Sequence, residues 1–212
     1  MKNIVVLSGG LDSSVTLAVA LDSLPRGDIH GLFFSYGQRH YDQELSAARG
    51  VADYYNIPLE VYSLEGIMSG GSLLGDGDIP REGYRLSNMS STVVEGRNLL
   101  FASVAIARVA PEGVVWVGVH GGDHALYPDC HPEFWEAVTT AAGAYEVKIK
   151  APFLNRSKTH IVGEGEKLGF PFHLTYSCYE GGELHCGECG TCRERKDSFL
   201  LSGVEDPTEY TS

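Results

Sequence analysis

Apolar residues gather in five short runs along the chain, separated by longer stretches of mixed polarity. The runs cover residues 4–7, 29–34, 59–64, 114–119 and 146–149. The first, second and fourth are apolar at almost every position, which is typical of strands buried on both faces of a parallel sheet. Residues 59–64 alternate between apolar and polar, as a strand with one buried face does. The pattern therefore predicts five strands.

Helix signals lie between these runs. Ser157 suits a helix N-cap, Pro132 suits a first turn, and Pro58 and Gly169 are typical of helix ends. A first helix opens at the Ser13-Ser14 pair, and further helices are predicted over residues 42–55, 99–110, 131–144 and 157–169.

Strands that alternate with helices predict an α/β fold, a five-stranded parallel sheet with helices on both faces. In such sheets, ligands bind beyond the carboxyl ends of the strands. We therefore expect the loops after the five strands to meet at one edge, near Ser8, Ser35, Leu64, Val119 and Ala151.

Residues 65–92 are rich in Gly, Ser and Asp and show neither helical nor strand periodicity. The stretch is too long for an ordinary connection in a compact domain. We interpret it as a mobile lid or as a contact between subunits, and we expect the chain to form a homodimer.

Composition narrows the classes of partner. The chain has 212 residues and a formal net charge of −12, so its bulk surface does not match the phosphates of a nucleic acid. No run approaches the ~18 apolar residues of a membrane span, and the N-terminus begins with a strand rather than with a signal segment. We expect a cytoplasmic protein that acts on a small molecule and has no nucleic-acid or membrane partner.

The segment that follows the first run carries the first chemical signal. Gly9 and Gly10 allow a sharp turn and a close approach of the backbone to a ligand, just before a helix N-terminus. The segment lacks the Lys of a Walker A loop and does not fit G-x-G-x-x-G. It resembles the S-G-G-x-D-S pyrophosphate loop of the ATP pyrophosphatases, which implies adenylation of a substrate. The predicted ATP-binding residues are Leu7, Ser8, Gly9, Gly10, Leu11, Asp12, Ser13, Ser14, Val15, Thr16 and Leu17.

Four cysteines near the C-terminus, Cys178, Cys186, Cys189 and Cys192, are spaced C-x7-C-x2-C-x2-C. Two-residue gaps bring thiolates together, and tetrahedral zinc requires four such ligands at about 2.3 Å. The spacing predicts a structural zinc site, with two disulfides, separate core thiols or an iron–sulfur cluster as alternatives. His185 is a further possible ligand. We assign residues 1–175 to the ATP-binding domain and residues 176–212 to a small zinc segment packed on it.

Further motifs extend the resemblance over nearly the whole chain. Residues 36–40 with Glu44 are similar to Y-x-Q-R-H…E, and residues 96–101 are similar to G-R-N-x-L-F. Other matching segments are 127–134, which is similar to Y-P-D-C-R-x-x-F, and residues 155–158, 175–179 and 206–210. With these motifs, the chain resembles the 7-cyano-7-deazaguanine synthase family of PP-loop ATP pyrophosphatases. His131 departs from the pattern, because many members have Arg there.

The resemblance implies an adenine nucleotide alpha hydrolase-like, Rossmann-like fold and an ATP-dependent ligase of queuosine and deazapurine biosynthesis. Its substrates would be 7-carboxy-7-deazaguanine and ammonia, its product a nitrile, and its cofactors ATP, zinc and magnesium. The carboxylate would be adenylated, ammonia would form the amide, and a second adenylation would allow loss of water. For catalysis we predict Asp12 as a magnesium ligand, and Arg39 and Lys158 as cations for phosphate charge.

The substrate requires donors for its carboxylate and acceptors for its guanine-like N–H edge. Arg97 suits the carboxylate, Asp129 suits the N–H edge, and Asn98 suits either.

Three other functions share parts of this pattern. An adenylating tRNA-thiolation enzyme would require a basic RNA-binding face and a free cysteine, for which Cys130 is the candidate outside the cluster. A related enzyme could transfer carboxy-deazaguanine to a protein amine instead of ammonia, and the change at His131 is compatible with this. A non-catalytic nucleotide sensor would use the same loop without turnover.

Overall fold

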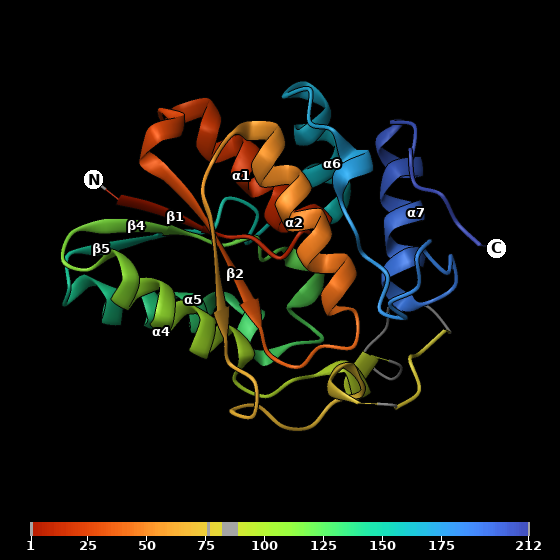
Figure 1. Ribbon diagram of the computed structural model, residues 1–212, viewed down its shortest axis with the longest axis horizontal. Helices are drawn as coiled ribbons and strands as arrows, with labels where there is room; N and C mark the ends of the chain where they lie inside the picture. Colours follow the sequence, from red (N-terminus) through yellow and green to blue (C-terminus); the bar gives the residue numbers. More distant parts are fainter. Residues whose placement is uncertain (1, 76, 82–88, 212) are drawn as a thin grey trace.

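The computed structural model describes residues 2–75, 77–81 and 89–211. Its centre is a five-stranded sheet in the order β3-β2-β1-β4-β5, and all four neighbouring pairs run parallel, as the sequence predicted. Figure 1 shows the strands between two layers of helices. The strands are β1 (Lys2–Val6), β2 (Ile29–Ser35), β3 (Leu59–Ser63), β4 (Gly113–Trp116) and β5 (Val147–Lys150).

Helices cover both faces of the sheet. One layer, below the sheet in Figure 1, contains α4 (Arg97–Val109) and α5 (Pro132–Gly143). The other layer, above the sheet, contains α1 (Leu11–Ser23), α2 (Tyr41–Tyr55), α6 (Lys158–Lys167) and α7 (Gly190–Ser202).

Alternation within the strands builds a core on each face. Ile4 packs into the cluster under α4 and α5, whereas its neighbour Val5 packs into the cluster under the other four helices. Trp116 and Trp135 are both buried in these clusters. The predicted helix ends are confirmed at two places: the Ser157 hydroxyl accepts a hydrogen bond from the His160 amide at 3.3 Å, and Pro132 begins α5.

The helix α7 was not predicted, and Ser157 therefore does not begin the last helix of the chain. Its buried residues have helical spacing but are mostly polar, namely Thr191, Cys192, Arg195, Ser198 and Phe199. A search for apolar periodicity misses such a helix, because its packed face carries few apolar side chains. The C-terminal segment shares a core with the sheet: Phe199 of α7 is buried in the same cluster as Val5, and its ring lies 5.0 Å from that of Phe172.

The aperiodic segment 65–92 lies partly outside the described residues, which exclude 76 and 82–88. Its described parts contain two short 3₁₀ turns, Ser72–Leu74 and Ser90–Thr92. Leu73, Ile79 and Met89 are buried in the core under α4 and α5. Its roles as a lid or subunit contact stay predictions. No helix in the described part of the chain is long and apolar enough to cross a membrane.

Candidate active site

A cavity of about 200 Å³ opens at the carboxyl edge of the sheet, and its lining includes residues that follow β1, β2, β4 and β5 but no described residue of the loop after β3. Among the residues predicted for the substrate and catalysis, Asp12, Arg97, Asn98 and Lys158 line it. From the predicted ATP loop, the lining residues are Leu7, Ser8, Gly10, Leu11, Asp12 and Ser13. The remaining helical residues of that motif, Ser14, Val15, Thr16 and Leu17, are fully buried.

The loop between β1 and α1 is held by its own serines. Ser8 Oγ lies 3.0 Å from Ser13 Oγ, and the Ser8 amide donates to Ser13 Oγ at 3.1 Å. Gly9 has φ +80°, and a Cβ there would lie 2.5 Å from the Glu44 carbonyl oxygen and 2.6 Å from the Ala48 nitrogen of α2. The turn therefore requires glycine at position 9 both for its backbone angle and for its contact with α2.

The same loop presents a helix N-terminus to the cavity. The N-cap of α1 is Gly10, and no side chain caps this end. Backbone N–H groups at an uncapped N-terminus attract anions. The geometry thus suits the phosphates of a nucleotide.

A buried group of charges lies beside this loop. Lys158 Nζ is 3.4 Å from Asp12 Oδ2 and 2.5 Å from Glu194 Oε2. His120 is fully buried, and its Nε2 lies 3.7 Å from Asp12 Oδ2 and 3.5 Å from Asp123 Oδ2. The structure therefore brings together Asp12 and Lys158, which lie 146 positions apart in the chain.

These carboxylates determine the charge of the lysine. Burial by itself lowers the pKa of Lys158, but attraction to Asp12, Glu194 and Asp123 outweighs burial and raises the pKa above its usual value. Lys158 is accordingly a fixed cation. Burial also raises the pKa of Glu194, with Lys158 opposing that effect.

Sequence reasoning did not predict Glu194. It comes from α7, two positions after the last cluster cysteine, and its carboxylate is held by Lys158 of α6. The one sequence signal that could have identified Glu194 is its position close to the cysteines along the chain.

Arg97 also lines the cavity, from the first turn of α4. Its guanidinium carbon is 5.9 Å from the centre of the Tyr36 ring, and Nη1 is 3.5 Å from the Tyr36 hydroxyl. Among the described residues, no Asp or Glu forms an ion pair with Arg97. The Arg97 guanidinium is half-buried, forms no ion pair with a described residue, and is attracted to the Asp129 carboxylate only at longer range. Such a guanidinium is a favourable site for a ligand anion.

Asn98 and Asp129 contact each other. Asp129 Oδ2 accepts the Asn98 backbone N–H at 2.9 Å, and thereby caps α4, while Asn98 Nδ2 lies 3.4 Å from Cys130 Sγ. Asp129 does not line the cavity. Burial, together with the negative charges of Asp123 and Asp129, raises the pKa of the Cys130 thiol, so Cys130 is a neutral thiol at physiological pH.

Arg39 does not line the cavity either. Its Nη1 donates to the Gly77 carbonyl at 2.8 Å, and its Nη2 lies 3.7 Å from Glu180 Oε2. Arg39 therefore contacts both the 65–92 segment, through Gly77, and the loop between Cys178 and Cys186, through Glu180. Its predicted contact with phosphate stays a prediction.

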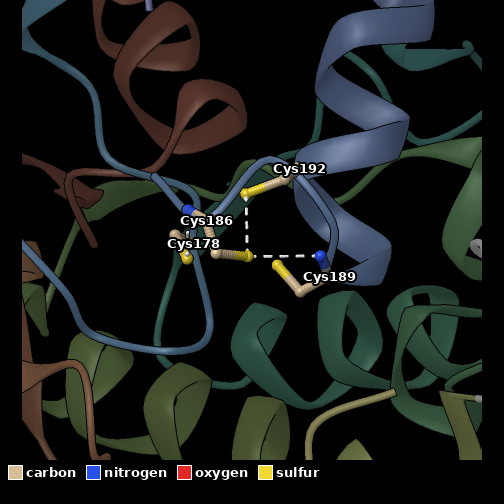
Figure 2. A group of neighbouring side chains, drawn as sticks. All are labelled: Cys178, Cys186, Cys189 and Cys192. Atoms are coloured by element: carbon tan, nitrogen blue, oxygen red, sulfur yellow. Dashed lines mark hydrogen bonds between the residues drawn. The ribbon is translucent and has the colours of Figure 1, made fainter. Parts of the chain in front are cut away.

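The four cysteines converge on one point (Figure 2). Their sulfur atoms all lie within 4.8 Å of one another, and the sulfurs of Cys186 and Cys192 are 4.0 Å apart. A tetrahedral ion with sulfur ligands at about 2.3 Å separates those sulfurs by about 3.8 Å. A four-iron cluster would hold the thiolates farther apart, because several iron and sulfide atoms lie between them. The donor set therefore fits a single metal ion.

Local hydrogen bonds favour the thiolate form of Cys189 in this cluster, whereas the same contacts raise the pKa of Cys192. The Cys189 amide donates to Cys186 Sγ at 3.3 Å, and hydrogen bonds from Cys178 and Cys192 lower the pKa of Cys189. His185 is engaged elsewhere: its Nε2 accepts the Ser177 N–H at 2.9 Å. The four cysteines, without His185, therefore form the candidate metal site.

Comparison with known proteins places this arrangement in a family. A family model described as queuosine biosynthesis protein QueC matches residues 2–203. The chain belongs to the QueC family. Three similar proteins are named 7-cyano-7-deazaguanine synthase. That from Rhizobium johnstonii is 45% identical and covers 99% of this chain and 92% of that protein. The protein from Brucella anthropi is 42% identical, and the alignment covers 99% of this chain and 94% of that protein. The protein from Marinobacter nauticus is also 42% identical, and the alignment covers 98% of this chain and 96% of that protein.

One solved structure agrees on the fold. The U34-tRNA thiolase NcsA from Methanococcus maripaludis, described with its 4Fe-4S cluster, aligns over 96% of this chain and 66% of its own, with a TM-score of 0.51. At 13% sequence identity this similarity shows the fold alone.

Proposed function

We propose that this chain is a QueC-family ligase that converts 7-carboxy-7-deazaguanine and ammonia to 7-cyano-7-deazaguanine at the expense of ATP. The observation that carries the proposal is one cavity with two anion sites. The N-terminus of α1 lies beside Lys158, and Arg97 lines the same cavity and forms no ion pair with a carboxylate among the described residues. Such a cavity suits a nucleotide phosphate chain and a substrate carboxylate together.

The residues act by position and charge. Ser8, Gly10 and Ser13 would hold the outer phosphates and leave the α-phosphorus open to the substrate carboxylate. Attack there forms the acyl adenylate and releases pyrophosphate. Ammonia then displaces AMP and gives the amide, with loss of one proton. A second adenylation, at the amide oxygen, releases a second pyrophosphate. The C–O bond then breaks, AMP leaves, and the nitrogen loses its two protons as the nitrile forms. Lys158 would stabilise the phosphate charge that develops in both adenylations.

Two metals are part of the proposal. Asp12 Oδ1 is buried and has no hydrogen-bond partner among the described residues, so it is free to bind magnesium that neutralises the phosphates. Zinc would bind to Cys178, Cys186, Cys189 and Cys192 and fix the start of α7, which carries Glu194.

We also propose that the protein acts in the cytoplasm as a homodimer without stable nucleic-acid binding. The protein-amine, tRNA-thiolation and sensor hypotheses gain no better support from the comparisons.

The nucleotide products test the mechanism. Incubation with ATP, ammonium and 7-carboxy-7-deazaguanine should yield the nitrile, and chromatography should find AMP and pyrophosphate with two ATP consumed per nitrile. Two oxygens leave the carboxylate carbon, and each requires its own activation. ADP and orthophosphate as primary products would refute the mechanism even if the nitrile formed.

A further inference from the structure

Glu44 of α2 lines the same cavity, and its side chain is held in place by Gln38. Gln38 Nε2 donates to Glu44 Oε2 at 3.2 Å and to the Phe34 carbonyl at 3.1 Å. Gln38 Oε1 accepts the Tyr36 backbone N–H at 2.8 Å, which fixes the orientation of the amide. The Glu44 carboxylate is thereby kept in one position and offers acceptors only.

No strong cation compensates this carboxylate. His40 lies beside it, with Nε2 3.4 Å from Glu44 Oε1, and is itself 2% exposed. Among the residues with described positions, no Lys or Arg forms an ion pair with Glu44. The Glu44 side chain is only 15% exposed, so water satisfies it poorly.

Glu44 and Arg97 carry opposite charges and line the same cavity. Tyr36 interacts with both residues. Its hydroxyl lies 3.5 Å from Arg97 Nη1, and burial raises its pKa to about 12, an effect that Arg97 opposes and Glu44 increases. Both charges line one cavity, and neither is paired with the other. A ligand with an anion at one end and N–H donors at the other would satisfy both.

We propose that Glu44 accepts hydrogen bonds from the ring N–H and exocyclic amino group of the substrate's guanine-like edge, while Arg97 binds its carboxylate. This assignment rests on the proposed function. It gives Glu44, rather than Asp129, the selection of the N–H edge, because one oxygen of Asp129 caps α4 and its side chain does not line the cavity.

The test compares two bases and two enzymes. The bases are 7-carboxy-7-deazaguanine and its analogue without the 2-amino group. The enzymes are the wild type and Glu44→Gln. The wild type should lose roughly 10- to 100-fold in kcat/KM on the analogue, because a buried charge-assisted hydrogen bond is lost. Glu44→Gln should show a similar loss on the parent base and little further loss on the analogue.

Control variants separate this role from stability. Glu164→Gln, which removes an exposed pair with Lys167, should keep the wild-type ratio between the two bases. Glu44→Asp keeps a carboxylate at this position and serves as the conservative variant. The melting temperature and metal content of each variant show whether the protein remains folded. Equal discrimination between the bases by wild type and Glu44→Gln would overturn the proposal. A rise confined to the KM for ammonia would overturn it as well.

Equilibrium binding keeps the two proposals apart. Calorimetry of both bases in the absence of ATP measures their recognition without turnover. Preference of the wild type for the 2-amino base, lost in Glu44→Gln, supports the role of Glu44 even if no nitrile forms. Nitrile formation without that preference supports the function and refutes the role of Glu44.

Discussion

Buried charged residues at the carboxyl edge of the sheet are held by a few contacts each. Lys158 contacts Asp12 and Glu194, and its removal would leave both carboxylates without their nearest cation. We expect Lys158→Met to lower turnover by roughly 10²-fold or more, because a preorganised cation next to the reacting phosphates is lost.

Steady-state kinetics and thermal unfolding check this prediction. The buried pair also contributes to stability, so the free energy of unfolding should fall by about 3 kcal/mol. Lys167→Met is the matched control, since Lys167 forms an exposed pair and should change neither quantity by much. Wild-type activity in a folded Lys158→Met protein would contradict the role.

Cys130 is the cysteine outside the metal cluster. Its pKa is raised by burial, so the thiolate that nucleophilic catalysis requires is scarce at neutral pH. We expect Cys130→Ala to lose only part of its turnover, through poorer packing next to Asn98. Complete inactivation of a folded, metal-loaded Cys130→Ala protein would contradict this expectation.

At the scale of elements, the phosphate loop depends on how α2 packs against it. Gly9 has a positive φ, and its Cα approaches the backbone of α2 so closely that a Cβ would overlap the Glu44 carbonyl. Gly66 has φ +77° with open space around it. The two glycines share a backbone angle and differ in their surroundings.

Gly9→Ala and Gly66→Ala therefore separate the two effects. Gly66→Ala should cost about 1 kcal/mol of unfolding free energy from backbone strain alone. Gly9→Ala should cost clearly more and should weaken ATP binding, because either the loop or α2 must move. Denaturant unfolding and nucleotide titration measure both. Equal effects of the two variants would show that the contact with α2 is unimportant.

At the scale of the whole molecule, the cysteine cluster joins the last helix to the active site. Cys189 precedes α7 and Cys192 lies in its first turn, and the same helix delivers Glu194 to Lys158. Arg195 extends the connection to the C-terminal tail through Thr208 at 2.6 Å. Loss of the metal should therefore disturb catalysis as well as stability.

Elemental analysis of purified protein should find one zinc per chain. Removal with a strong chelator under reducing conditions should lower the melting temperature and abolish turnover, and added zinc should restore both. Cys130→Ser, which leaves the cluster intact, should keep its metal. Iron in place of zinc would contradict the assignment.

The sequence by itself determined the five strands, the parallel sheet, the tight turn between β1 and α1 and the grouping of the four cysteines. Each of these features depends on residues that are close together in the sequence: apolar runs form strands, two glycines form the turn, and cysteines at short spacing converge. The helix α7 left no such pattern, because Thr191, Arg195 and Ser198 occupy its buried face.

Only the tertiary structure decided which side chains meet in the cavity. It brought Glu194 to Lys158, placed Glu44 and Arg97 on one cavity, and directed Asp129 to the end of α4 and Arg39 toward Glu180. The direction of a polar side chain depends on the partners that distant segments supply, and these partners are set when the helices pack on the sheet.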